Sequence, residues 1–520
     1  MSAHPRRLSL PVFVIALALS AGLVAGTAPR VALAAPTYTV NDPGDTTGGS
    51  CAVGSTTCTL RLAIQNANGN PGSTINVTSG LVIVFGLGNS QMVITAAMTI
   101  QTTAAGNATI DGTLSSQGVL DINTTSPVTI TGLNVGNGTN SFAGGAIGVA
   151  PGSAATLNNL TLSGNKCTQL PGVGGAIINS GSLGLHNVTL TNNGAGCSYG
   201  GGIYSDGPLH IDGGSITGNT AGFAGGGIYM SIGGSSSLTV TGTSISNNTA
   251  QVQGGGVFAQ ANVNLTRVHI SGNTVTAGNG GGIGITVSTA VLTNSTIDGN
   301  HATTGNGGGI YVNAAQLTLT GSTVSANDVH GTGTNGLGGG IYATASTDSF
   351  TNSTIAGNRA DTTGGAVYAT TSTVNLNSVT VANNFGPGGT PGIFIPGTTT
   401  VNLHNTILAN TPSNCSGTAT SQGYNIDTGN SCALAATGDL PNTDPQLAAL
   451  AANGGPTLTM ALPAASPAVN AGDPACPPPA SDQRGISRPQ GSRCDIGAFE
   501  LVLPAPPPPP VPAPPATGRV

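Results

Sequence analysis

The sequence predicts an all-β fold, a right-handed parallel β-helix solenoid with a short N-terminal helical cap. Three observations support this prediction: an unusual composition, a regular internal repeat, and short alternating apolar runs inside each repeat. Among 520 residues, 83 are Gly, none is Trp, and charged residues make up only 5%. A composition this far from that of ordinary globular domains indicates a repetitive structure.

The repeat is marked by two series of residues that stay in phase. The first is the motif Gly-Gly-(Gly/Ala)-(Ile/Val), whose last residue recurs at Ile147, Ile177, Ile203, Ile228, Val257, Ile283, Ile310, Ile341 and Val367. The second is an Asn three residues after an apolar residue, at Asn165, Asn193, Asn219, Asn248, Asn273, Asn300, Asn327, Asn358, Asn384 and Asn410. Within each series, the intervals between successive residues are shorter than the about 34 residues of helical hairpin repeats and the about 40 residues of propeller blades, which excludes both architectures.

Each repeat contains three short runs of alternating apolar residues. In one unit these runs are residues 307–312, 317–319 and 324–327. Runs of this length that are rich in β-branched residues predict strands and not helices. Three strands joined by Gly and Asn turns form one coil, and stacked coils bury their Ile, Val and Leu side chains against equivalents above and below. Ten coils at a strand spacing of ~4.8 Å would form a rod about 48 Å long.

The recurrent Gly and Asn residues have physical roles in this geometry. Glycine allows a positive φ and a close approach of neighbouring backbone at the turns. Asn residues at equivalent positions of stacked coils can form a ladder of hydrogen-bonded side-chain amides. The longest connection from a ladder Asn to the next Gly-Gly motif, from Asn327 to Ile341, predicts a surface loop of the kind that carries binding sites.

The N-terminal segment 1–34 indicates an export signal peptide. Arg6 and Arg7 belong to a charged start, the run 8–24 is apolar, and small residues suit cleavage before Ala35. A membrane anchor of similar length is the alternative, but no stop-transfer pattern follows. No other segment is apolar for long enough to cross a bilayer, so we expect no membrane span in the mature chain.

The eight cysteines form an even set, which in an exported chain indicates disulfides. Sequence neighbours offer four local pairs, although the spacing leaves the connectivity open. The candidates are Cys51 with Cys58, Cys167 with Cys197, Cys415 with Cys432, and Cys476 with Cys494. No Cys or Cys/His spacing resembles a zinc site, so we expect neither a metal site nor a cofactor.

One mature segment has helical periodicity. Apolar residues stand at four positions of residues 59–67 that share one helical face, which predicts a helix covering the first coil. Around it, residues 38–41 (YTVN), Cys51 and residues 58–63 (CTLRLA) resemble the bacterial CSLREA domain. Such domains precede β-helical surface proteins, and the resemblance implies that residues 35–80 form a CSLREA-like N-terminal cap.

The segment after this cap has less regular repeats. Within residues 98–135, the runs 119–122 (VLDI) and 128–133 (VTITGL) resemble opening coils of the pectin-lyase-like superfamily. This places the opening β-helix coils at 81–143 and the regular repeats at 144–413. The Gly-Gly-Gly-Ile and Ile-x-x-Asn repeats are also similar to those of chlamydial polymorphic outer-membrane proteins, which implies a solenoid on a cell surface.

The C-terminal part carries separated sequence blocks in a fixed order. They are DP at 444–445, NGGPT at 453–457, SPAVNAG at 466–472, DQRG at 482–485, RP at 488–489 and CDIGAFE at 494–500. Together they resemble the choice-of-anchor Q domain, which implies a Q-like C-terminal domain over 414–500. We expect this domain to cap the solenoid and its charged residues to form structural ion pairs. The Pro-rich tail 501–520 predicts a stiff spacer.

The scarcity of charge limits the possible function classes. A net charge of −6 without any basic cluster argues against nucleic-acid binding, which requires cations that neutralise phosphates. A polysaccharide hydrolase would need paired carboxylates, and a lyase would need a basic residue, often beside calcium ligands. Residues 144–410 contain only Asp206, Asp212, Asp298, Asp328, Asp348 and Asp361 as acids and Lys166, Arg267 and Arg359 as bases. We therefore assign no catalytic residue.

One group of polar residues stands out in the repeat alignment. The residue directly after the ladder Asn is His301, Asp328 and Arg359 in three consecutive coils, and His330 and Asp361 lie in the same loops. Stacking would bring these candidate ligand-binding residues together on one edge. A solvated charge ladder is one interpretation, and a glycan or cation site is the other. If the group binds glycan, changing Asp328 and Arg359 together should abolish binding.

A Tyr follows the Ile or Val of the first motif in five coils. These residues are Tyr204, Tyr229, Tyr311, Tyr342 and Tyr368. Stacked coils would align their rings in an aromatic stripe. Packing of the rings against one another is the simpler interpretation, and stacking on sugars is the alternative.

We therefore expect an exported, non-catalytic β-helical protein at the cell surface, acting in adhesion, surface structure or carbohydrate binding. The expected partner is an extracellular polysaccharide or another cell surface. A polysaccharide lyase or glycoside hydrolase of the pectin-lyase-like superfamily is the alternative. The two functions differ in whether acidic and basic groups converge in one groove.

Overall fold

Each short apolar run forms one strand of a coil. The computed structural model describes residues 34–104, 106–386 and 390–502, so the expected signal peptide and Pro-rich tail lie almost wholly outside the described residues. One coil comprises β34 (Ile310–Asn313), β35 (Gln316–Thr320), β36 (Thr323–Ser325) and β37 (Asp328–Val329). The first three strands correspond to the three runs expected in one repeat, and the fourth follows the ladder Asn.

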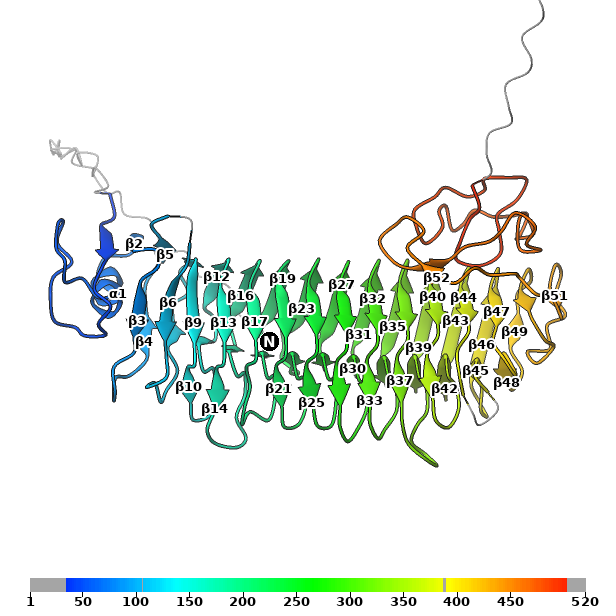
Figure 1. Cartoon of the computed structure of the whole chain (residues 1–520), viewed down its shortest axis with the longest axis horizontal. Helices are drawn as coiled ribbons and strands as arrows, with labels where there is room; N and C mark the ends of the chain where they lie inside the picture. The colour runs from blue at the N-terminus through cyan, green and yellow to red at the C-terminus, as the bar shows by residue number, and fades with distance from the viewer. Residues whose placement is uncertain (1–33, 105, 387–389, 503–520) are drawn as a thin grey trace, which may run out of the picture. The chain divides into compact units, whose positions relative to one another are not determined.

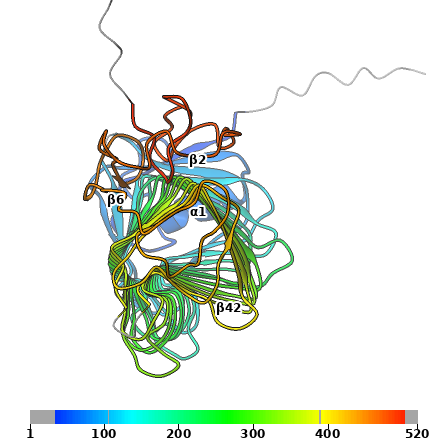
Figure 2. The ribbon, with the colours of Figure 1, turned by 90° about the vertical axis from the view of Figure 1, so that its right-hand side faces the viewer.

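Equivalent strands of successive coils pair in parallel and form three long sheets among the described residues (Figure 1). Sheet A has 15 strands from β1 (Thr37–Val40) to β49 (Thr420–Ser421), and sheet B has 15 from β3 (Val82–Val84) to β51 (Leu440–Pro441). Sheet C has 13 strands and ends at β48 (Cys415–Ser416). The three sheets surround the core, as the view along the coils shows (Figure 2). The predicted right-handed parallel β-helix is confirmed.

The stack extends past the ten coils that the ladder Asn residues mark. At the N-terminal end, β1 pairs with β2 (Ser73–Val77), so the segment expected to be a cap contributes strands to sheet A. At the other end, β47 (Ile407–Ala409) pairs with β50 (Ile426–Asp427). These outer coils lack the Gly-Gly motif, which is why the sequence repeat undercounts them.

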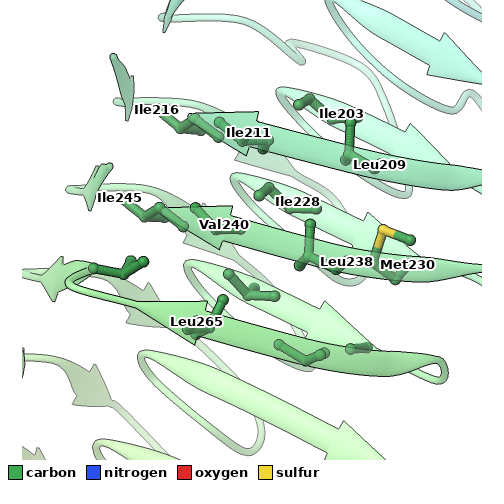
Figure 3. Close-up of a cluster of buried hydrophobic side chains, with 14 of the residues drawn as sticks. Ile203, Leu209, Ile211, Ile216, Ile228, Met230, Leu238, Val240, Ile245 and Leu265 are labelled. Atoms are coloured by element: carbon green, nitrogen blue, oxygen red, sulfur yellow. The ribbon is translucent and has the colours of Figure 1, made fainter. Parts of the chain in front are cut away.

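Inward-facing side chains at equivalent positions stack in rows (Figure 3). Ile203 of β18 (Ile203–Ser205) lies in register with Ile228 of β22 (Ile228–Met230), and both are fully buried. Neighbouring rows contain Leu209 and Leu238, Ile211 and Val240, and Ile216 and Ile245. Because side chains alternate along a strand, each buried row leaves an adjacent row on the outer surface of the sheet.

The Asn residues of the second series form a continuous ladder inside the solenoid. The side-chain Nδ2 of Asn300 donates to Oδ1 of Asn327 and to the carbonyl oxygen of Ile270, both at 2.9 Å. The same Oδ1 of Asn327 accepts the backbone N–H of Asn300 at 3.0 Å. The amide contacts repeat from Asn165 to Asn410, and all ladder members are buried. The predicted ladder is therefore present.

The ladder ends on a buried carboxylate. Asn410 donates to Oδ1 of Asn414 at 3.0 Å, and Asn414 donates to Oδ1 of Asp427 at 2.6 Å. Asp427 also accepts the backbone N–H groups of Gly429 and Cys432, both at 3.0 Å. Because every ladder amide donates in the same direction, this end of the chain of hydrogen bonds requires an acceptor, and an ionised carboxylate only accepts.

Helix α1 (Leu60–Asn68) is the predicted helical cap, and its buried face is Leu60, Ala63, Ile64 and Ala67. The hydroxyl of Thr59 caps the N-terminus by accepting the backbone N–H of Leu62 at 3.2 Å. Arg61 forms an ion pair with the buried Asp45 at 2.7 Å. Within the described residues, no helix combines the length and the apolar character that crossing a bilayer requires.

The C-terminal segment 445–500 packs on the outer face of sheet B. Buried Gln483 donates to Oγ1 of Thr323 at 2.9 Å and accepts a hydrogen bond from Oγ1 of Thr354 at 2.6 Å. The backbone N–H of Ala498 donates to Oγ1 of Thr380 at 3.0 Å. These three Thr residues occupy equivalent outward positions in successive coils. The expectation of a terminal cap over 414–500 is therefore wrong for residues 445–500, because this segment covers a flank of the solenoid, whereas β48 to β51 complete the last coils.

The covered flank has its own sequence signature. Outward positions that are Ser or Asp in earlier coils become Ala356, Ala382 and Ala409. The apolar side chains of β52 (Leu450–Ala451) and β53 (Thr459–Met460) pack against these small residues. Inside the segment, two of the expected ion pairs form, Arg484 with Asp482 at 2.7 Å and Arg488 with Glu500 at 3.2 Å.

The eight cysteines form four disulfides, each between sequence neighbours. They are Cys51–Cys58, Cys167–Cys197, Cys415–Cys432 and Cys476–Cys494. The Cys167–Cys197 bond joins two adjacent coils, whose adjacency is also shown by the parallel bridge between Lys166 and Ala195. This disulfide adds a covalent link where the coils are otherwise joined by hydrogen bonds.

One carboxyl group lies inside the apolar core. Asp348 of β39 (Thr347–Thr351) is in register with the core residue Val374 and is fully buried. It accepts the backbone N–H of Leu317 at 3.0 Å and the hydroxyl of Ser346 at 2.7 Å. Burial raises the pKa of Asp348 to about 6, and the two hydrogen bonds offset part of this effect.

Replacing one ladder residue should destabilise the solenoid strongly. In N300A the amide and backbone N–H of Asn273 lose their acceptor, and the carbonyl of Ile270 loses a donor. Buried groups left unpaired cost about 1–3 kcal/mol each, so we expect the free energy of unfolding to fall by about 3 kcal/mol or more. Denaturant unfolding measures the change. N264A on an exposed strand position is the control, and an equal loss in both variants would contradict the ladder's role.

Removing the buried charge should stabilise the protein at neutral pH. The pKa of Asp348 is higher in the folded chain than its ordinary value of 3.8, so the folded chain binds the proton more tightly. The free energy of unfolding is therefore highest below about pH 4, and it decreases by about 3 kcal/mol in total as the pH rises to about 6. We expect D348N to unfold at higher denaturant concentration at pH 7.5 and to match the parent chain at pH 4. If D348N and the parent chain were equally stable at pH 7.5 as well as at pH 4, the destabilising effect of an ionised Asp348 would be refuted.

Candidate functional site

The polar residues predicted from the repeat lie in the loops that follow the ladder Asn residues, beside sheet C, and we name these loops the lobes. In six consecutive coils, the residues after the ladder Asn form a two-residue strand of a parallel lobe sheet. Its strands are β21 (Thr220–Ala221), β25 (Thr249–Ala250), β29 (Thr274–Val275), β33 (His301–Ala302), β37 (Asp328–Val329) and β41 (Arg359–Ala360). Ala302, Val329 and Ala360 point inward and form a small core, so the preceding residues face outward.

Glycine is required where the lobe rejoins sheet C. Gly307 has a φ of +69°, and a Cβ on Gly308 would lie 2.3 Å from the carbonyl oxygen of Asp328 in the next coil. Because a Cβ cannot be accommodated at that distance, only glycine fits at this position. The Gly-Gly motif therefore lets successive lobes stack closely enough for their outward residues to touch.

The structure brings all five predicted site residues into one continuous cluster. His301, Asp328 and Arg359 are in register on adjacent strands, and Nδ1 of His301 donates to Oδ1 of Asp328. His330 lies between two carboxylates, with Nε2 at 3.6 Å from Asp328 Oδ2 and Nδ1 at 2.8 Å from Asp361 Oδ2. Arg359 donates to Oδ1 of Asp361 at 2.8 Å. We name these five residues the lobe cluster.

The contacts within the lobe cluster shift the pKa values of His301 and Asp328. The hydrogen bond to Asp328 raises the pKa of His301, although partial burial acts against it. Burial alone would raise the pKa of Asp328, but the hydrogen bond from His301 and the charges of His301, His330 and Arg359 lower it overall. The lobe cluster therefore brings imidazole, carboxylate and guanidinium groups into direct contact on one edge of the solenoid.

The Tyr stripe forms on the outer face of sheet C as predicted. Tyr311, Tyr342, Tyr368 and Phe394 stack in sequence, with ring centroids 5.0–5.3 Å apart and interplanar angles of 3–11°. They belong to β34, β38 (Ile341–Thr344), β42 (Val367–Thr370) and β45 (Ile393–Phe394). A second stack joins Tyr204 and Tyr229 at 5.3 Å. Within a stack, the inner rings expose their edges, and free faces are found at the ends.

A groove of about 430 Å³ follows this stripe, and we name it the aromatic groove. Its floor is Tyr342, Tyr368 and Phe394, and its rim includes Thr334, Leu337, Thr362, Thr363 and Thr370. Thr334 and Leu337 belong to the long connection between Asn327 and Ile341 that the sequence marked as a surface loop. The lobe cluster lies in the same loops, since Asp361 directly precedes Thr362.

A second hollow was missed by the sequence reasoning. It measures about 510 Å³ and lies between sheet B and the C-terminal segment, where Arg267, His269 and Asp298 face Pro456 and Leu458. Within it, the ring nitrogen Nε2 of His269 contacts Asp298 Oδ1 at 2.6 Å. The signal was present in the register, because β28 (His269–Ser271) pairs with β32 (Thr296–Asp298) on the same face.

The fold and the repeated lobes define a parallel β-helix repeat protein. The Chlamydia polymorphic membrane protein repeat family matches residues 242–260. This stretch contains Asn248 of the ladder and Val257 of the Gly-Gly motif, so the match corresponds to one repeat. A comparison with curated proteins gives no match.

Two solved structures show a distant likeness to the chain. The crystal structure of pectate lyase Pel9A is 15% identical, with a TM-score of 0.29, over 89% of this chain and 96% of that chain. The crystal structure of bacteriophage CBA120 tailspike protein 3 is 13% identical, with a TM-score of 0.31, over 71% of this chain and 60% of that chain. A likeness of this size does not carry either protein's activity to this chain.

The contact between His269 and Asp298 should be visible in the titration of the imidazole. The hydrogen bond with Asp298 raises the pKa of His269, and partial burial acts in the opposite direction. In D298N we expect the pKa of His269 to fall, measured by NMR of the imidazole protons. D212N is the control, because Asp212 lies 3.8 Å from His186. An unchanged pKa of His269 in D298N would disprove the contact.

Proposed function

We propose that this protein is an exported surface β-helix that binds a polysaccharide along the aromatic groove without cleaving it. The observation that carries the proposal is the chemistry of the groove, an aromatic floor bordered by Thr334 and Thr370. Aromatic rings pack against the C–H faces of sugars, and hydroxyl groups exchange hydrogen bonds with sugar hydroxyls. The floor follows the direction in which coils stack, which suits an extended ligand.

Phe394 is the residue best placed to stack on a sugar ring. Its inner face covers Tyr368, with centroids 5.0 Å apart. In the next coil its register partner is Ser416, which is too small to cover the other face of the ring. Burial raises the pKa of the neighbouring Tyr342 to about 12, so the Tyr342 hydroxyl remains a neutral hydrogen-bond donor at physiological pH.

The surroundings of the groove favour binding over catalysis. Its lining contains neither a carboxylate nor a Lys, Arg or His side chain. The nearest acidic residue in sequence, Asp361, is held by Arg359 and His330. Hydrolysis of a glycosidic bond requires two carboxyl groups that flank the bond, and this lining does not supply them.

The remaining segments complete the proposal for a surface protein. Residues 1–34 would direct export as a signal peptide, and the disulfides suit an oxidising extracellular environment. Residues 35–80 would be the CSLREA-like segment, residues 81–143 and 144–413 the opening and regular coils, and residues 414–500 the choice-of-anchor Q-like domain. The proposed partner is an extracellular polysaccharide or the surface of another cell, and the proposed role is adhesion or surface structure.

Aromatic substitutions in the groove test the proposal. The mature chain 35–520 is titrated with soluble neutral and acidic polysaccharides, and binding and release of products are recorded separately. Loss of a stacked ring costs about 1.4 kcal/mol, so we expect F394A and Y368A to bind about tenfold more weakly. Y204A removes a ring from the other stack and should bind like the parent chain. F394Y restores the ring and should restore binding.

Three results would overturn this function. The first is an absence of binding to every polysaccharide tested, and the second is equal weakening in Y204A and F394A. The third is release of unsaturated or reducing-end products, which would favour the lyase or hydrolase alternative. In that case D298N and D328N would identify which acidic residue the reaction uses.

A further inference from the structure

Three residues of the lobe cluster have the arrangement of metal ligands. His301, Asp328 and His330 each offer one ligand atom, and these three atoms lie within 4.8 Å of one another. The residues come from adjacent strands of the lobe sheet, β33 and β37, and from the position directly after β37. Their side chains are half-buried, with exposed fractions of 29–39%, so an ion could enter from solvent.

We propose that His301, Asp328 and His330 bind one transition-metal ion, such as Zn²⁺. Two imidazole nitrogens and one carboxylate oxygen form a ligand set that suits zinc and related ions, whereas Ca²⁺ and Mg²⁺ require oxygen ligands throughout. This site goes beyond carbohydrate binding and does not depend on it. The fourth coordination position would face solvent.

The neighbours of His330 prepare it for this role. Nδ1 of His330 contacts Oδ2 of Asp361 at 2.8 Å, and this carboxylate would orient the ring so that Nε2 serves as the ligand atom. Nε2 points toward Asp328, with 3.6 Å between it and Oδ2. Arg359 in turn holds Asp361 through Oδ1 at 2.8 Å. A carboxylate that orients the imidazole is the usual second layer of a zinc site.

The distances fit an ion after small side-chain rotations. Zinc binds nitrogen at about 2.0–2.1 Å and carboxylate oxygen at about 2.0–2.2 Å, so tetrahedral ligand atoms lie roughly 3.3 Å apart. The 3.6 Å between His330 and Asp328 is close to this value. His301 and Asp328 share a hydrogen bond, and an ion would replace its proton and separate the two atoms. Metal binding should therefore release protons.

Other His–Asp pairs on the solenoid lack the third ligand. His269 contacts Asp298 at 2.6 Å, and His186 lies 3.8 Å from Asp212. Among the described residues, only His301, Asp328 and His330 bring three such groups together. The His269 pair is therefore a matched control with the same chemistry and one ligand fewer.

Zinc titration of the untagged mature chain tests the site. Calorimetry with ZnCl₂ at pH 7.5 should give one ion per chain, with heats that depend on the buffer because protons are released. H301A, D328N and H330A should each lose this binding, while H269A keeps it. D361N retains all three ligands and should bind about 10–100-fold more weakly. F394A should bind Zn²⁺ like the parent chain, which separates this site from polysaccharide binding.

Folding of each variant is checked by circular dichroism and denaturant unfolding. No saturable binding of Zn²⁺ by the parent chain would overturn the proposal. Binding that persists in a chain carrying H301A, D328N and H330A together would also overturn it, because the ion would then bind elsewhere. Equal loss in H269A would assign the effect to general imidazole binding and would likewise reject the site.

Discussion

Axial stacking of equivalent coils is the constraint on which the structure depends. Parallel pairing at a spacing of ~4.8 Å places every residue directly between its equivalents. A buried polar side chain must then be satisfied by its own copies, and Asn meets this requirement because its amide both donates and accepts. The ladder from Asn165 to Asn410 and its end on Asp427 follow from that requirement. The apolar rows fill the space that remains.

The same stacking assembles surface chemistry from residues far apart in sequence. His301, Asp328 and Arg359 become neighbours because each directly follows a ladder Asn. The rings of Tyr342 and Tyr368 become neighbours because each directly follows the last residue of the Gly-Gly motif. The same loops therefore contribute residues to both the lobe cluster and the aromatic groove. A change in the length of one loop would alter both features.

Features marked by periodic residues could be predicted from sequence, and features without a periodic signal could not. The ladder, the stripe and α1 each follow from periodic residues. The docking of Gln483 on Thr323 joins positions 160 residues apart and has no periodic signal. Asp348 breaks the alternation of polar and apolar residues, so its place in the core could not be expected from its chemistry. The His269–Asp298 pair depends on the register between β28 and β32. The two residues lie at different positions of their repeats, so aligning the repeats does not place them opposite each other.

The docked C-terminal segment divides the solenoid into a part of fixed length and a part of variable length. Coils between Ile203 and Ile245 pair only with adjacent coils and lie outside the Cys167–Cys197 disulfide, so duplication or loss of one whole coil there would preserve the other contacts. The coils from Thr323 to Ile407 are spanned by one segment whose contacts match their spacing. Related chains should therefore differ in solenoid length through the number of coils before Thr323. The number of coils that the C-terminal segment covers should stay constant.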